Sequence, residues 1–312
     1  MNATPDQDAL FRATHVGGSE VSALFGENPW LTEFELWHRK KGTIATPEFN
    51  AIKDDGTPEA ERIYWGVRLE SAIIDAAKER YGYEDRNPAG DLPALSNGKG
   101  LGGHPDRRVT CPQRGKVLLE VKMADWLVRK GWGDEPPLNY LLQGTTYAGL
   151  DQCDGFDLLV LVGGNKLERF QYDFRPKLYA EIERRVESFW ESVHANRPPK
   201  ADYSRDLDTI RELYADASDT TIDLRGDNLA ITAAAEYQLA SAEAKAAQKR
   251  ADAAKAELLE KLGNHTVGMM DGFIVKATAV APNPGTEVTD EMVGTFINAR
   301  KGYRVFSVKE AR

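Results

Sequence analysis

The spacing between Asp106 and Glu120 is the feature that most constrains how this chain can fold. The two acids flank a turn-rich stretch at 111–115, and the residues on either side of it follow patterns that are typical of strands. The spacing therefore predicts a β-hairpin. Because side chains along a strand alternate between its two faces, Glu120 and Lys122 project from the same face, where Asp106 on the paired strand can meet them.

The chemistry of that face points to a divalent cation. Two carboxylates and an ammonium are costly to bury as bare charges, whereas Mg²⁺ takes hard oxygen ligands. We expect Asp106, Glu120 and the Val121 carbonyl to be metal ligands. Lys122, with its pKa lowered by metal charge and burial, would orient or deprotonate a water. Glu70 is a fourth group, acting through a second metal or a bound water. The alternative is a hairpin whose solvated face happens to carry these charges.

The composition limits the class of protein. A chain of 312 residues with 41% apolar residues can build one large domain, or a domain of about 200 residues with an appendage. We find no signal peptide and no apolar run near the roughly 20 residues of a membrane span, so we expect a soluble, cytoplasmic protein. Cys111 and Cys153 are too few for a disulfide framework or a four-ligand zinc site, and we expect reduced, partly buried thiols.

The net charge of −9 argues at first sight against a nucleic-acid partner, because phosphate binding usually leaves a basic surface. Its distribution matters more than the total. Residues 61–200, which contain the predicted site, carry 21 Lys and Arg against 21 Asp and Glu, so the excess acid lies outside them. An acidic exterior around a locally basic channel would suit an enzyme that moves along DNA. Composition alone does not choose between these interpretations.

Hydrophobic periodicity and turn residues divide the chain at about residue 200. Residues 1–200 predict an α/β domain with a mixed central sheet flanked by helices, and residues 201–312 predict an α+β appendage that braces the core or mediates oligomerisation. In the first domain we expect helices at 20–25, 33–41, 63–81, 138–150 and 176–195, and further strands at 156–162 and 167–174. In the appendage we expect a helix at 229–262, a hairpin at 265–281 and a helix followed by a strand at 289–312.

Two helices carry further detail. The 63–81 helix is expected to place Glu70 beside a buried stripe made of Leu69, Ile73, Ala76, Ala77 and Tyr81. On the 138–150 helix, Gln143 and Tyr147 stand four residues apart and share one face, which can look across the metal site. Their amide and hydroxyl suit a phosphate oxygen or Lys122, and the alternative is an ordinary, partly exposed pair. The stretches from Trp126 to Pro137 and from 201 to 228 are expected to be loops.

Several short motifs occur in the order found in one known family. They are Gly18-Ser19-Glu20-Val21, Asn28-Pro29-Trp30 with Glu35-Leu36-Trp37, Trp65-Gly66 with Leu69-Glu70, Pro105-Asp106, Glu120-Val121-Lys122, and Gln143 through Tyr147. The chain resembles the YqaJ-like viral recombinase family, the phage exonucleases similar to lambda exonuclease, within the PD-(D/E)XK nuclease superfamily. The resemblance covers about residues 12–175, and the shared order is stronger evidence than any single motif.

The resemblance implies a restriction-endonuclease-like core. It also implies that the catalytic and Mg²⁺-binding residues are Glu70, Asp106, Glu120 and Lys122. Arg12, seven residues before Ser19, matches the arginine that with that serine holds the 5′-phosphate of a DNA end. A guanidinium fork and a helix N-terminus are both good phosphate receptors.

The sequence departs from the family at Arg107 and in residues 229–312, and His104 beside the site has two possible roles. Arg107 follows Asp106 where the family more usually has Gly, so the backbone turns differently there or Arg107 touches DNA. His104 is either a ligand or a loop histidine packed under the hairpin. Residues 229–312 match the family only loosely.

The resemblance implies a Mg²⁺-dependent alkaline exonuclease, with Mn²⁺ as an alternative metal, that degrades double-stranded DNA 5′-to-3′ from phosphorylated ends. The exposed 3′ strands would serve a single-strand annealing protein, in the cytoplasm of a bacterium that carries the phage or prophage. The alternatives are a related endonuclease of repair or restriction type, and a catalytically silent DNA-end-binding protein. The presence of Asp106, Glu120 and Lys122 argues against the silent protein.

The family also implies a ring-shaped homotrimer. A ring would reconcile an acidic chain with a polyanionic substrate, because each subunit could turn basic residues inward while its acidic surface faces solvent. The basic residues near the predicted site are Arg107, Arg108, Arg129 and Lys130.

Overall fold

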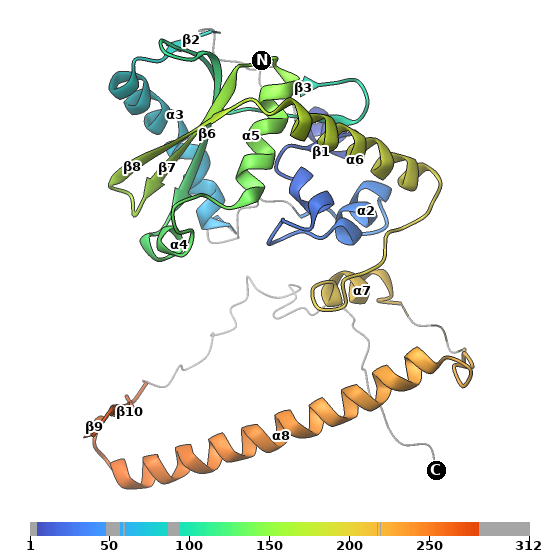
Figure 1. Cartoon of the computed structure of the whole chain (residues 1–312). Helices are drawn as coiled ribbons and strands as arrows, with labels where there is room; N and C mark the ends of the chain where they lie inside the picture. Colours follow the sequence, from blue (N-terminus) through green and yellow to red (C-terminus); the bar gives the residue numbers. More distant parts are fainter. Residues whose placement is uncertain are drawn as a thin grey trace, which may run out of the picture. The chain divides into compact units, whose positions relative to one another are not determined.

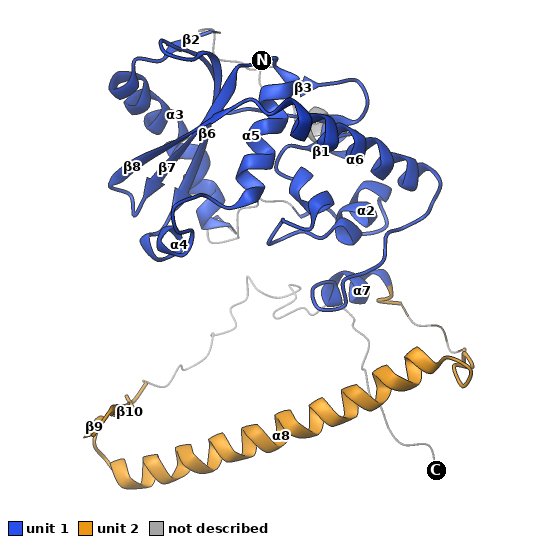
Figure 2. Cartoon of the chain, viewed as in Figure 1, with its two compact units in different colours: residues 1–213 blue, residues 214–312 orange. Residues whose placement is uncertain are grey.

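The chain divides into two compact units, residues 1–213 and residues 214–312 (Figure 2). The structure, a computed structural model, describes residues 5–47, 57–58, 60–86, 94–216, 218 and 220–280. The first unit continues past the boundary expected near residue 200. The Thr32 hydroxyl donates a hydrogen bond to the carboxylate of Asp206 at 2.5 Å, which ties the stretch around Asp206 to the N-terminal helices.

A five-stranded mixed sheet lies at the centre of the first unit, in the order β2-β5-β6-β7-β8 (Figure 1). Its strands are β2 (Glu84–Asp85), β5 (Arg107–Cys111), β6 (Gly115–Ala124), β7 (Gly155–Val162) and β8 (Lys166–Asp173). The β5–β6 pair is the predicted antiparallel hairpin, whereas β6 and β7 run parallel. A parallel pair needs a crossover connection, and here the crossover contains α4 (Trp126–Gly131) and α5 (Leu138–Leu150).

Helices cover both faces of this sheet (Figure 1). On one face, α3 (Glu61–Tyr81) packs Ile73, Ile74 and Ala77 against Leu119 and Val121 of β6. On the other face, α5 packs Tyr147 and Ala148 against Leu118 of β6 and the apolar residues of β7. The central strand β6 is therefore buried on both sides, which fixes the positions of the polar side chains that it carries.

A third core joins the N-terminal elements to α5 and α6. The elements that contribute are β1 (Val16–Gly17), the 3₁₀-helix η1 (Val21–Phe25), α2 (Glu33–Lys41), β4 (Leu101–Gly103) and α6 (Pro176–His194). The first unit also contains α1 (Pro5–Thr14), β3 (Leu95–Ser96) and α7 (Leu207–Leu213). β1, β4 and β3 form a small sheet of their own. α2 begins at Thr32, whose hydroxyl accepts a hydrogen bond from the Glu35 amide at 3.0 Å, and it ends at Gly42 with φ 74°.

The second unit contains α8 (Asn228–Leu262) and a hairpin of β9 (Val267–Met270) and β10 (Phe273–Lys276). The Asp227 carboxylate caps α8 by accepting hydrogen bonds from two backbone amides at 2.9 and 3.0 Å. Gly272, with φ 79°, forms the turn of the hairpin. Within the described residues, Leu262 is the single buried residue of α8.

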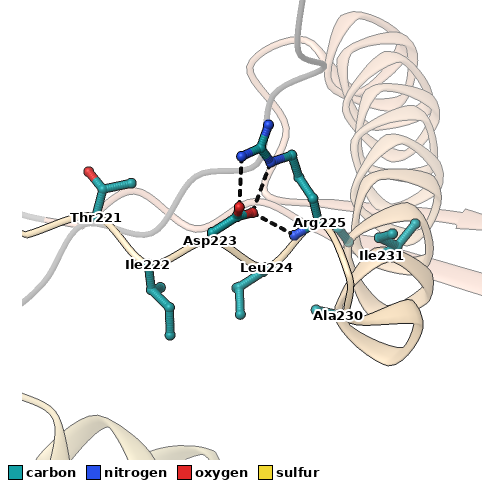
Figure 3. Close-up of a pocket in the computed structure, with 8 residues that line it drawn as sticks. Thr221, Ile222, Asp223, Leu224, Arg225, Ala230 and Ile231 are labelled. Atoms are coloured by element: carbon teal, nitrogen blue, oxygen red, sulfur yellow. Dashed lines mark hydrogen bonds and ion pairs between the residues drawn. The ribbon is translucent and has the colours of Figure 1, made fainter.

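A shallow hollow lies beside the start of α8 (Figure 3). Ile222, Leu224 and Ile231 line it with apolar surface, and its two charged residues, Asp223 and Arg225, pair with each other at 2.7 Å. Because that pair is self-satisfied and no other charged residue lines the hollow, we do not consider it a candidate for catalysis.

The predicted α/β fold, with a mixed central sheet flanked by helices, is confirmed. Two predicted loops are wrong: Trp126–Gly131 forms α4, capped by the Asp125 side chain, and Leu207–Leu213 forms α7. Ile74, rather than Ala76, is buried on α3. The helix and strand predicted at 289–312 lie outside the described residues. Among the described residues, no helix is both long and apolar enough to span a membrane.

Candidate active site

The β5–β6 hairpin brings Asp106 to the middle of β6. Asp106 lies directly before β5, and its Oδ2 accepts a hydrogen bond from the backbone amide of Val121 at 2.6 Å. That bond fixes the carboxylate between Glu120 and Lys122 along the strand. The structure therefore shows the predicted contact between Asp106 and this part of β6.

Glu120 is the buried centre of the site, with 2% of its surface exposed. Its Oε1 accepts hydrogen bonds from Lys122 Nζ at 2.5 Å and from the amide of Gln143, on α5, at 2.6 Å. Glu120 and Lys122 lie two residues apart on one strand and share a face, as the alternation predicts. Gln143 reaches the site as expected, but its amide bonds Glu120 rather than Lys122.

The three carboxylates of the site repel one another. Burial, followed by repulsion from Glu120 and Glu70, raises the pKa of Asp106 well above its usual value. Burial and the charge of Glu120 likewise raise the pKa of Glu70, on α3, although Lys122 and Arg107 act against this. Raised pKa values at Asp106 and Glu70, near a further carboxylate, are typical of a site that receives a cation.

The pKa of Lys122 does not follow the sequence prediction. Burial acts to lower it, but attraction by Glu120 and Asp106 outweighs burial, and the pKa is raised above the ordinary lysine value. The expectation of a lowered pKa is wrong for the protein without metal, because it left out the carboxylates that surround the ammonium. Lys122 is a stable cation here.

The residues fit a divalent cation in their donor chemistry. Glu120 Oε2 is buried and has no hydrogen-bond partner, so the site contains an oxygen lone pair that the protein itself does not satisfy. Carboxylate oxygens of this kind are the ligands that Mg²⁺ prefers. No group of three or more His, Cys, Asp or Glu side chains among the described residues is arranged to hold a metal ion. The predicted ligand set of Asp106, Glu120, Glu70 and the Val121 carbonyl therefore stays a prediction.

Tyr147 is buried against the site and acts as a spacer. A Cβ added to Gly18 or to Gly103 would lie 2.4 or 2.5 Å from its ring, so both segments approach the ring as closely as glycine allows. Burial, together with Glu120 and Asp106, raises the pKa of the Tyr147 hydroxyl, which stays neutral. Through this contact, the turn that carries Ser19 packs against α5.

Arg12 and Ser19, the predicted phosphate-binding residues, are both exposed. Arg12 lies in the last turn of α1, and Ser19 lies in the turn before η1. The Ser19 carbonyl accepts a hydrogen bond from the side chain of Asn28 at 3.1 Å. The N-cap of η1 is Glu20, without a side-chain capping bond, so the predicted phosphate site stands beside a 3₁₀ turn rather than at an α-helix N-terminus.

Two of the four basic residues near the site belong to the fold. Arg108 is buried and pairs with Asp151 at 3.0 Å, and Arg129 pairs with Glu168 at 2.6 Å. Lys130 is exposed, with its ammonium 6.0 Å from the centre of an aromatic ring, that of Trp126.

The other two residues that the sequence singled out lie near Asp106. Arg107 is partly buried and acts electrostatically on Glu70. His104 is exposed, and its ring contacts the ring of Phe11 edge-on, with 5.1 Å between the two ring centres. The expectation that it packs under the hairpin is therefore wrong.

The structure adds Tyr140 to the site. The ammonium of Lys122 lies 5.6 Å from the centre of its ring, within the range of a cation–π interaction. Tyr140 precedes Gln143 by three residues on α5 and therefore shares its face. The three-residue spacing between Tyr140 and Gln143 could have identified Tyr140 from the sequence as a residue of the site.

Sequence comparison matches residues 9–150 to the YqaJ-like viral recombinase domain. The chain is 27% identical to protein YqaJ of Bacillus subtilis (strain 168) over 229 residues, which are 72% of this chain and 68% of that protein. The alkaline exonuclease LHK-Exo of Laribacter hongkongensis is similar in structure, with a TM-score of 0.47 and 17% identity, covering 62% of this chain and 94% of that one. A phage-related exonuclease of Haemophilus somnus 129PT gives a TM-score of 0.42 at 13% identity, covering 58% and 96%. Residues 9–150 contain the Asp106, Glu120 and Lys122 motif, so the part of the chain that is similar to the YqaJ-like viral recombinase domain includes the acidic cluster.

Proposed function

We propose that the chain is a Mg²⁺-dependent exonuclease that degrades double-stranded DNA 5′-to-3′ from phosphorylated ends. The observation that carries the proposal is the convergence of Asp106, Glu120 and Lys122 around the unsatisfied Oε2 of Glu120, with Glu70 near enough to raise the pKa of Asp106. The match of residues 9–150 to the YqaJ-like viral recombinase domain supports a role in DNA processing. Phosphodiester hydrolysis needs what this cluster offers: oxygen ligands for a cation, and a positive charge beside them.

Each residue of the cluster has a distinct task in this proposal. Asp106, Glu120, Glu70 and the Val121 carbonyl would hold the cation. When bound, Mg²⁺ activates a water and neutralises charge at the phosphate. Lys122 would orient or deprotonate the attacking water, since its ammonium lies beside Glu120 in the acidic cluster. Gln143 holds Glu120 in place through the 2.6 Å bond.

The direction of digestion rests on Arg12 and Ser19. Both are exposed, and the turn that carries Ser19 lies against Tyr147, whose pKa responds to Asp106 and Glu120. A terminal phosphate held at this turn would place the first phosphodiester bond of the same strand near the cluster. The product would be a 3′ single strand, which suits a single-strand annealing partner in a bacterial cell that carries the phage.

The assembly that we propose is a homotrimeric ring. A net charge of −9 is unfavourable for a subunit that must stay on DNA, and a closed ring would retain the substrate by topology as well as by charge. Because Arg108 and Arg129 are engaged in ion pairs and Arg107 lies 3.9 Å from Asp85, the basic lining of such a ring would depend on other residues, with Lys130 among the candidates.

A digestion assay tests the activity. End-labelled linear duplexes with a phosphate or a hydroxyl at the 5′ end are incubated with Mg²⁺ or with a chelator, beside covalently closed circles. We expect Mg²⁺-dependent release of mononucleotides from phosphorylated 5′ ends and intact circles. Glu120→Gln keeps the size of the side chain but loses the charge, and it should reduce the rate by at least about a thousandfold. Cleavage of circles would favour the endonuclease, and digestion from 3′ ends only would reject the direction.

A further inference from the structure

Lys40, in the last turn of α2, is a nearly buried cation, with only 4% of its side chain exposed. Its ammonium donates one hydrogen bond to the backbone carbonyl of Arg12 at 2.7 Å and another to Glu20 Oε2 at 2.6 Å. A buried ammonium is costly unless it is paired and hydrogen-bonded. The next residue, Lys41, is exposed, so the end of α2 does not bury every lysine that it carries, and Lys40 is buried because of the contacts at its own position.

The first contact holds the end of α1. The carbonyl of Arg12 belongs to the last turn of that helix, where backbone carbonyls lack helical partners and where a cation is favourable. Lys40 supplies both a donor and a positive charge at this place. The backbone from which the Arg12 side chain extends is thereby tied to α2.

The second contact holds the turn that contains Ser19. Glu20 Oε2, which Lys40 binds, also accepts a hydrogen bond from the Gly17 amide at 2.8 Å, and the Glu20 amide donates to the Gly17 carbonyl at 2.8 Å. The turn between Gly17 and Glu20 is closed by side chain and backbone together. Ser19 lies within it, and its carbonyl is held from the other side by Asn28.

The charge at this place is suited to an anion. The charges that act on Lys40 are those of Glu20, Arg12 and Arg39, so with Glu35, the partner of Arg39, the place holds three cations against two acids. Arg39 is itself paired with Glu35 at 2.5 Å. Burial, opposed by Glu20, lowers the pKa of Lys40 below the ordinary lysine value, in keeping with a crowded cationic region.

We propose that Lys40 is a positioning residue for binding of a terminal phosphate: one ammonium fixes Arg12 through its backbone carbonyl and Ser19 through Glu20. The inference rests on the proposed function, because it presumes that Arg12 and Ser19 receive the 5′-phosphate. It adds a residue that contacts neither the phosphate nor the metal ligands. Its role is to hold two separate segments at a fixed mutual distance, which a bidentate anion site requires.

The test is a binding measurement in chelator, where no cleavage occurs. Fluorescence anisotropy gives the affinity for short duplexes with a 5′-phosphate and for identical duplexes with a 5′-hydroxyl. For Lys40→Met, which keeps the length of the side chain, we expect the preference for phosphate to fall about tenfold while affinity for the hydroxyl duplex stays within about twofold. Lys41→Met removes the same charge one residue later, where the ammonium bonds the Val193 carbonyl at 3.2 Å, and it should leave the preference unchanged.

Two further variants keep the test decisive. Lys40→Met combined with Glu20→Gln avoids leaving a partly buried carboxylate without its cation, so it should fold even where the single variant does not, and it should show the same loss. Lys40→Arg retains the charge and should recover part of the preference. Equal losses on both duplexes, or an unchanged preference in the Lys40 variants, would overturn the inference, as would a wild type without any preference for phosphate. Because cleavage plays no part in this measurement, an absence of nuclease activity would count against the proposed function and not against Lys40.

Discussion

At the scale of single residues, local spacing predicted the acidic cluster well. Asp106, Glu120 and Lys122 come together because a hairpin pairs neighbouring segments and a strand alternates its side chains. Contacts between distant segments could not be predicted in this way. The ion pair of Lys40 with Glu20 joins two helical regions through their tertiary packing, and nothing in the sequence between them sets that distance.

The charge of Asp106 is predicted to cost stability in the protein without metal. Its pKa is raised in the folded state, chiefly by burial and then by Glu120 and Glu70. The folded state therefore holds the proton more tightly than the unfolded state, and stability falls as the pH rises from the unfolded aspartate value of about 4 through the folded value. Asp106→Asn removes this loss and can still accept the hydrogen bond from Val121.

Thermal unfolding in chelator at several pH values measures this effect. At neutral and higher pH, Asp106→Asn should melt at least roughly 2 °C above the wild type, and the difference should shrink toward zero near pH 4. Adding Mg²⁺ should stabilise the wild type and not the variant. Asp75→Asn, at an exposed carboxylate on α3, is the control and should change little. A variant less stable than the wild type at all pH values would contradict the prediction.

At the scale of elements, the sequence specified those with a strong period or clear end signals. α5 and α8 lie within a residue of their predicted bounds, because proline or aspartate begins each and a break in pattern ends it. The short helices α4 and α7 span fewer than two full turns, so they offer too little periodicity to recognise. The sequence predicted Ala76 in the buried face of α3, because small residues occur on several sides of that helix. In the structure, Ile74 packs against the sheet instead.

The start of α2 gives an element-scale prediction. Thr32 accepts a hydrogen bond from the Glu35 amide at 3.0 Å and donates one to the buried Asp206 at 2.5 Å. Thr32→Ala removes the cap and leaves Asp206 with one partner fewer, at a cost of about 2 kcal/mol. The melting temperature should fall by roughly 4–8 °C. Thr32→Ser keeps the hydroxyl and should lose less than half as much, and equal losses in both variants would show that the methyl group, not the hydroxyl, matters.

At the scale of the whole molecule, the long helix α8 of the second unit leaves most of its apolar side chains exposed. α8 has 35 residues, yet within the described residues it buries only Leu262, and apolar side chains such as Leu229, Ile231 and Leu239 are exposed. Exposed apolar surface of this extent commonly marks an interface. The sequence leaves open whether the appendage braces its own domain or reaches a neighbouring subunit, and the mass of the protein in solution distinguishes these roles.

Light scattering on the purified chain at micromolar concentration is the measurement. A ring of three copies has a mass of about 104 kDa, three times the 34.6 kDa of one chain. Stable closure needs on the order of 1,000 Å² or more at each contact. If α8 contributes to those contacts, a chain that ends at Leu213 should show a smaller mass while retaining its melting transition, because the sheet and all three apolar cores lie before that residue. An unchanged trimer after truncation would place the contacts in the first unit, and a mass of one chain for the full protein, with and without DNA, would reject the ring.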